Sequence, residues 1–136
     1  MINEEQIKKE IVWEESRFGL GDRLLKGTYK GRTCQIPDRL VRSKHEAQQL
    51  IEQQIFDYTR LEDIRQRLYN ARREMAMRFG QSAKWAILSR DVWNFYSNEI
   101  QKKVPMYMGP IGIPMIEGGL NVAIVDGPAT DIVEVA

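Results

Sequence analysis

The chain has 136 residues, with 20 basic and 19 acidic side chains and a single cysteine. That length suits one domain, and the near-neutral charge gives no general reason to expect nucleic acid, an anionic membrane or a strongly acidic partner. Cys34 alone excludes an internal disulfide and a cysteine metal cluster, and no apolar run reaches the roughly 20 residues of a transmembrane helix. Because the acidic start lacks signal-peptide features, we expect a cytosolic folding environment and no membrane partner.

The first segment predicts a helix from Asn3 to about Phe18. Asn3 is a suitable N-cap, and Gln6 stands three residues later, as in a capping box. Ile7, Ile11 and Phe18 fall on one face of such a helix, and five glutamates make it acidic. We therefore expect it to complement the arginines further along the chain.

Residues 19–40 predict irregular structure, because glycines and Pro37 interrupt them too often for a long element. A short hairpin from Leu24 to Ile36 is compatible with the residues there, several of which tolerate strand geometry. Basic side chains outnumber acidic ones from residue 23 to residue 44. This segment is the most basic part of the chain.

The stretch from Ser43 to Phe79 contains neither glycine nor proline and predicts one long helix around which the chain is organised. Ser43 and Glu46 have the spacing of a capping box, in which each side chain satisfies a backbone N–H. Gly80 supplies the stop signal, since a residue without Cβ readily takes the left-handed conformation after a helix end.

Apolar residues recur in this helix with the seven-residue spacing of a coiled coil. The predicted seam consists of Leu50, Leu61, Ile64, Leu68 and Met75. A parallel homodimer would place flanking arginines opposite each other, which disfavours it. Antiparallel pairing, or packing against the acidic first helix, avoids that repulsion. An amphipathic core helix in a monomeric bundle is the alternative interpretation.

Beyond Gly80, Ser82 can cap a third helix from Ala83 to about Val104, where Pro105 forbids continuation. Its aromatic stripe is typical of core rather than of a cofactor site. Residues 105–136 contain no basic residue and four of the five prolines, which favours an extended arm.

Two parts of this arm, Leu120–Val125 and Asp131–Val135, predict short strands. Because so apolar a segment is costly to leave in water, we expect the arm to lie on its own surface or a partner's. The predicted anchors of the arm are Met106, Tyr107, Ile111, Ile113, Met115 and Ile116.

No motif predicts catalysis, a metal site or a cofactor. His45 is the only histidine, and neither a second metal ligand nor a nucleophile elbow accompanies it. The glycines after Pro105 lack the lysine and hydroxyl of a phosphate loop. Asp126 and Asp131 lack the alternating oxygen ligands of a calcium loop. We therefore predict a protein that is not an enzyme.

The predicted fold is mainly α: a helical bundle around the coiled-coil-like helix 43–79 in a helical domain 1–104, an extended C-terminal arm 105–136, and room for one small β-hairpin. The expected function is structural assembly, in which the chain oligomerises through its helices and docks its arm on itself or another structural protein, with a virion component as the special case. The alternative is a nucleic-acid-binding or regulatory helical protein that uses the basic segment 23–44 and the central helix. Its candidate nucleic-acid contacts are Arg65, Arg72 and Arg73.

Overall fold

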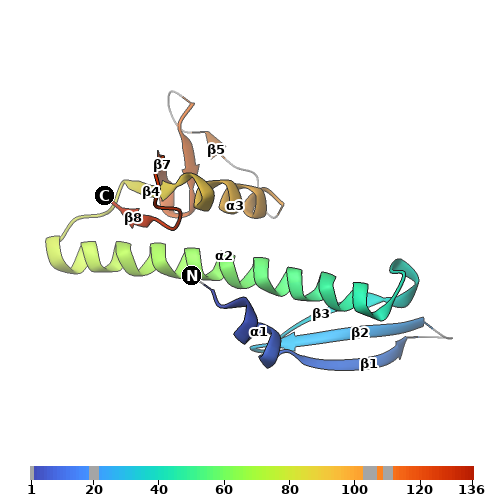
Figure 1. Cartoon of the computed structure of the whole chain (residues 1–136). Helices are drawn as coiled ribbons and strands as arrows, with labels where there is room; N and C mark the ends of the chain where they lie inside the picture. Colours follow the sequence, from blue (N-terminus) through green and yellow to red (C-terminus); the bar gives the residue numbers. More distant parts are fainter. Residues whose placement is uncertain (1, 19–21, 103–106, 109–111) are drawn as a thin grey trace. The chain divides into compact units, whose positions relative to one another are not determined.

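The computed structural model describes residues 2–18, 22–102, 107–108 and 112–136 (Figure 1). The chain divides into two compact units, residues 1–60 and residues 61–136. The division falls inside the helix α2 (Lys44–Phe79), so the first part of this helix belongs to one unit and the remainder to the other. Each unit has its own sheet and its own hydrophobic core.

The first unit combines an antiparallel three-stranded sheet with three helical segments. Its elements are α1 (Glu4–Glu10), β1 (Val12–Phe18), β2 (Asp22–Tyr29), β3 (Arg32–Pro37), the short 3-10 helix η1 (Asp38–Leu40) and the first part of α2. The strand order is β1-β2-β3. Its buried core consists of Ile7, Ile11, Leu25, Ile36, Ala47, Ile51, Ile55 and Phe56.

The helix predicted from Asn3 to Phe18 is wrong beyond Glu10. Its cap is present, since the Asn3 side chain accepts a hydrogen bond from the Gln6 N–H at 3.2 Å. Ile11 then takes an extended conformation and β1 follows. The β-branched and aromatic residues at this point favour a strand once β2 offers a partner, and tertiary pairing therefore prevails over the local helical pattern.

The hairpin allowed between Leu24 and Ile36 is present as β2 and β3, paired from Leu24 opposite Pro37 to Tyr29 opposite Arg32. Lys30 and Gly31 join the two strands, and both have positive φ, 46° and 79°. Two successive positive φ values belong to the type I′ turn, whose twist matches that of the strands it connects. The strand of this sheet that the sequence does not predict is β1, which pairs with β2.

α2 confirms the prediction of one long helix. Ser43 Oγ accepts a hydrogen bond from the Glu46 N–H at 3.1 Å, and the Glu46 carboxylate in turn accepts from the Arg42 N–H at 3.2 Å. At the other end, Gly80 has φ +63° and donates its N–H to the Ala76 carbonyl at 3.0 Å. Both termini are therefore fixed by local interactions.

The second unit contains the rest of α2, α3 (Arg90–Gln101) and a five-stranded sheet of order β5-β6-β7-β4-β8. The strands are β4 (Trp85–Ser89), β5 (Tyr107–Met108), β6 (Pro114–Ile116), β7 (Leu120–Val125) and β8 (Val133–Val135); the 3-10 helix η3 (Glu117–Gly119) precedes β7. β4 and β7 are parallel, and the other pairs are antiparallel. The core includes Leu61, Ile64, Leu68, Leu88, Val92, Tyr96, Ile116, Leu120, Val122 and Val133.

The third predicted helix is correct only from Arg90 onward, because residues 85–89 form β4. A short apolar run reads equally well as a buried strand or as part of a helix. The outcome depends on β7, which pairs in parallel with β4 although each paired residue is 36 positions away along the chain. No local signal reports such a partner.

The mainly α prediction is wrong, because the chain carries two sheets besides its long helix. The extended arm is wrong as well: the described part of residues 105–136 forms β5 to β8, and it completes the sheet of its own unit. The predicted strand Leu120–Val125 matches β7, and β8 lies within the predicted strand Asp131–Val135. Ile116, Leu120, Val122 and Val133 are thus buried within the chain itself.

Candidate interaction site at the edge strand β8

β8 is the last strand in the order of the five-stranded sheet, so among the described residues one of its sides has no neighbouring strand in that sheet. Its backbone directions follow from three hydrogen bonds: Ala136 N–H donates to the Trp85 carbonyl at 3.0 Å, Trp85 N–H to the Ala136 carbonyl at 2.9 Å, and Ser89 N–H to the Ile132 carbonyl at 3.1 Å. Bonding directions alternate along an antiparallel strand. Val133 and Val135 therefore direct their N–H and C=O groups away from β4.

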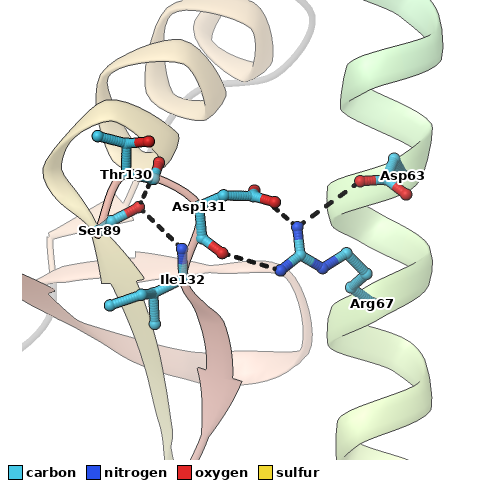
Figure 2. Close-up of polar contacts among 6 residues, drawn as sticks. All are labelled: Asp63, Arg67, Ser89, Thr130, Asp131 and Ile132. Carbon is cyan, nitrogen blue, oxygen red and sulfur yellow. Dashed lines mark hydrogen bonds and ion pairs between the residues drawn. The ribbon is translucent and has the colours of Figure 1, made fainter. Parts of the chain in front are cut away.

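Ser89 fixes the point where the chain enters β8 (Figure 2). Its hydroxyl donates to the Thr130 carbonyl at 2.9 Å and accepts from the Ile132 N–H at 3.1 Å. Ser89 is 1% exposed, so these two bonds satisfy groups that water cannot reach. Ser89 also occupies the N-cap position of α3, but its hydroxyl makes no capping bond there.

Arg67, on the part of α2 that belongs to the same unit, holds the same segment from the other side (Figure 2). Its Nη1 lies 2.8 Å from Asp131 Oδ1, and its Nη2 donates to the Asp131 carbonyl at 3.1 Å. Asp63 Oδ2 lies 3.7 Å from Nη1 and adds a second carboxylate. The residue before Ile132 is thus attached to α2, while Ile132 itself is attached to β4.

A groove of about 370 Å³ runs beside β8. Its lining consists of Ala71, Glu74, Met75, Arg78 and Phe79 from α2 and all three residues of β8. Ala71, Met75 and Phe79 are spaced by four residues and therefore share one face of the helix. Phe79 is 70% exposed, which leaves a large apolar side chain at the mouth of the groove.

The charges around the groove are nearly balanced. Glu74 and Arg78 form an ion pair at 3.1 Å, with both side chains largely exposed. Glu134, the middle residue of β8, is exposed and forms no ion pair with any described residue. One negative charge at the open edge is therefore left without a counter-charge from the described chain.

Three of the five residues of the predicted helix seam are buried inside the second unit. Leu61, Ile64 and Leu68 are 1%, 1% and 6% exposed, and they pack in a core with strands and α3 of their own unit. Leu50 is 45% exposed, because Ile51 is the residue that faces the core of the first unit. Met75 is half-buried and lines the groove.

The predicted arm anchors whose burial the structure describes differ in their exposure. Ile116 is 8% exposed and belongs to the core of the second unit, whereas Ile113 and Met115 are half-buried. Tyr107 lies in β5, and Met106 and Ile111 lie outside the described residues. Of the residues that line the open groove, Met75 belongs to the predicted seam, whereas Phe79 is not among the predicted site residues.

The arginines proposed as nucleic-acid contacts have different surroundings. Arg65 Nη2 lies 2.8 Å from Glu117 Oε2, and this hydrogen bond raises the pKa of Arg65. Glu117 also accepts a hydrogen bond from the hydroxyl of Tyr96, whose pKa is raised by burial. The Arg72 guanidinium lies against Gly118, where an added Cβ would collide with it.

The acidic partners of Arg65 and Arg67 come from the C-terminal region and from α2 itself, where Glu62 and Asp63 lie close to them. Glu117 pairs with Arg65 and Asp131 with Arg67, instead of the glutamates of the first predicted helix. Arg73 is exposed. Because Arg65 and Arg67 already form ion pairs, they are less suited to bind phosphates as part of a continuous row of arginines.

A second cavity, of about 250 Å³, lies in the first unit and is lined by charged side chains of both signs. Lys44 forms an ion pair with Glu15 there at 2.5 Å, and the hydrogen bond and charge of Lys44 lower the pKa of Glu15. Arg23, Arg42 and Asp38 complete its charged lining. Across the described ranges, no three His, Cys, Asp or Glu side chains gather as metal ligands.

The chain matches no protein-family model, no curated protein and no solved structure. In the part of the chain that the structure describes, no helix has both the length and the apolarity needed to cross a bilayer. The edge strand with its groove is the most developed open site on the described surface, since it combines backbone hydrogen-bonding groups, apolar side chains and an uncompensated charge.

Proposed function

We propose that this chain is a non-enzymatic interaction protein, which takes part in assembly by accepting an extended segment of another protein beside β8. The single observation that carries the proposal is the coincidence of an edge strand with an apolar groove. Strand addition uses both features: main-chain hydrogen bonds supply affinity, and pockets for alternate side chains supply selectivity. Val133 and Val135 provide the main-chain hydrogen-bonding groups, and Met75 and Phe79 line the groove that receives side chains.

The exposed apolar surface at the end of α2 gives the proposal its energetic basis. Phe79 is 70% exposed, although burying a side chain of this size contributes about 1.5–3 kcal/mol. A large exposed apolar side chain beside an open strand edge favours a protein partner.

Selection from an unbiased library of displayed peptides tests the proposal directly. The bait is the purified full chain, and the selected peptides are then measured against Phe79→Asp and Met77→Asp. Met77 is a matched control, because it is equally exposed on the last turns of α2 but does not line the groove. We expect binding to survive Met77→Asp and to be lost in Phe79→Asp. Enrichment of no peptide, or binding indifferent to Phe79, would refute the proposal.

Self-assembly through the same groove is a distinct form of this function. Sedimentation of the purified chain at several concentrations measures it, and a dimer abolished by Phe79→Asp would identify a second copy as the occupant. We also propose that the chain folds in the cytosol, in keeping with its single cysteine, and take a virion component as the special case. Capsid or tail genes next to its coding sequence would support that case.

Nucleic-acid binding is the second candidate function. The observation that favours it is the pair Arg72 and Arg73, neither of which forms an ion pair with a described residue. Phosphate contacts of this kind weaken steeply as salt rises. The candidate therefore requires binding that falls with salt and is reduced by reversing the charge of both arginines. Salt-independent binding, or none, would exclude it.

A further inference from the structure

We infer that the segment bound beside β8 carries a lysine or arginine opposite Glu134 and apolar side chains at the two adjacent positions. This inference rests on the proposed function, and it adds the chemical pattern of the partner. The pattern follows from three features of the second unit: the two faces of β8, the charge of Glu134, and the cost of pairing β8 with a second copy of itself.

The faces of β8 determine where each side chain of an added strand would lie. Val133 is 8% exposed and belongs to the same core as Leu61, Ile64 and Leu68 of α2, and Val135 packs against that core. Glu134 is exposed, on the opposite face. Directly paired residues of neighbouring strands share a face. The residue opposite Glu134 therefore lies on the exposed face, and its two neighbours point to the side of α2.

The groove explains why those two neighbours are apolar. On the α2 side, the edge of β8 adjoins Met75 and Phe79, with Ala71 one turn before Met75. Two apolar side chains placed there cover Phe79, which is 70% exposed in the isolated chain. A polar residue at either position would lose its contact with water against an apolar wall.

The charge of Glu134 explains why the middle residue is basic. Glu74 is already paired with Arg78 at 3.1 Å, so Glu134 is the groove residue whose charge no described side chain compensates. Opposite charges placed directly across two strands stabilise the pair, and like charges destabilise it. Between a lysine and a glutamate at this position, we expect a difference of about 3- to 10-fold in affinity.

The same charge disfavours a second copy as the occupant. Antiparallel pairing of β8 with itself, using the outward groups of Val133 and Val135, places Glu134 directly opposite Glu134 of the other copy. A register shifted by two residues needs the Asp131 backbone, whose carbonyl already accepts a hydrogen bond from Arg67. Charged residues on edge strands are a common protection against such self-pairing. The pattern therefore points to a different chain.

Three synthetic peptides test the inference. They are identical eleven-residue strands with a central Val-Xaa-Val, in which Xaa is lysine, glutamine or glutamate. Binding to the full chain is followed by NMR from the amide signals of Val133 and Val135, which also locates the site. We expect the order lysine, glutamine, glutamate on wild type. Glu134→Lys should reverse that order, and Glu134→Gln should remove the preference.

A pair of proline variants checks that binding is strand addition. Val135→Pro removes an N–H that points away from β4, and proline is tolerated at such positions of edge strands. Glu134→Pro instead removes a backbone N–H that points toward Ile87 of β4. We expect Val135→Pro to retain its fold by circular dichroism and to lose the lysine peptide. Undiminished binding to folded Val135→Pro would overturn the inference.

The remaining outcomes separate this inference from the proposed function. Equal affinity of the three peptides on wild type, or an order unchanged by Glu134→Lys, would overturn the basic pattern. Groove-dependent binders from the unbiased library that lack the pattern would overturn it as well, and the proposed function would stand. Self-association through β8 would overturn the choice of a different chain. Failure of the library and of all three peptides would refute both proposals.

Discussion

Arg67 binds Asp131 through two different groups: its Nη1 lies 2.8 Å from the carboxylate Oδ1, and its Nη2 donates to the backbone carbonyl at 3.1 Å. Both residues belong to the second unit, and Asp131 stands two residues before β8. The position of the edge strand thus depends on a side chain of α2 as well as on its hydrogen bonds to β4.

Replacing Arg67 with Met should loosen the entry to β8. The variant keeps the apolar part of the side chain and removes both hydrogen bonds, so we expect a loss of about 1–2 kcal/mol in the free energy of unfolding. Hydrogen exchange of the Ile132 and Ala136 amides, which are bonded to Ser89 and Trp85, should accelerate. Arg78→Met is the control, because its exposed pair with Glu74 contributes little. Equal effects of the two substitutions would contradict this role of Arg67.

Ser89→Ala should destabilise the second unit more than its small change in volume suggests. The substitution leaves the Thr130 carbonyl and the Ile132 N–H without their partner in a site that is 1% exposed. Unsatisfied buried groups cost about 1–3 kcal/mol, measurable by denaturant unfolding. Ser97→Ala removes an exposed hydroxyl bonded to the Asn94 carbonyl at 3.3 Å and should change stability by less than about 0.5 kcal/mol. A neutral Ser89→Ala would show that water replaces the hydroxyl.

The features that the sequence predicts well depend on interactions between residues close together in the chain. The ends of α2 depend on Ser43, Glu46 and Gly80, which act within a single turn and were recognised from their spacing alone. The strand Leu120–Val125 is predicted because turn-forming residues flank a short run of residues with high β propensity. By contrast, β1 and β4 were read as helix, since their strand character depends on partners far along the chain.

The candidate site was missed for a similar reason. The sequence predicts Met75 as part of a helix seam, on the same apolar stripe of α2 as Leu68. Leu68 is buried in the core of the second unit, whereas Met75 lines the groove beside the edge of the sheet. The sequence does not show where along α2 the sheet ends. The sequence predicts a short strand over Asp131–Val135 without revealing that it lies at an edge of the sheet. Edge position is a property of the whole sheet, so no window of a few residues contains it.

Gly27→Ala should destabilise the first unit by overpacking. A Cβ at this position would lie 2.7 Å from Ile51 Cγ2 and 3.1 Å from the Trp13 ring. Forcing extra atoms into a packed core typically costs about 1–3 kcal/mol. The same substitution in an Ile51→Ala background should cost less, because the nearest obstructing atom is gone. Thermal or urea unfolding of the four proteins in this cycle measures the coupling, and strict additivity would place the strain elsewhere.

The ion pair of Arg90 with Asp126 should make stability depend on acid pH. Arg90 Nε and Nη2 donate to the two Asp126 oxygens at 2.9 and 3.0 Å, and this hydrogen bonding lowers the pKa of Asp126 from its ordinary value of 3.8. A carboxyl whose pKa is lower in the folded state stabilises the fold above its unfolded pKa, and that contribution disappears as pH falls through the folded value.

Arg90→Gln should therefore return the Asp126 pKa toward 3.8, which an NMR titration of the carboxyl carbon would follow. Because both side chains are exposed, the difference in stability between wild type and variant should be small at pH 7. It should shrink as pH falls below about 4 and disappear once pH is below the lowered pKa of Asp126 in the wild type, where the carboxyl is protonated in both proteins. A difference that grows on acidification would mean that Arg90 acts through a group other than Asp126.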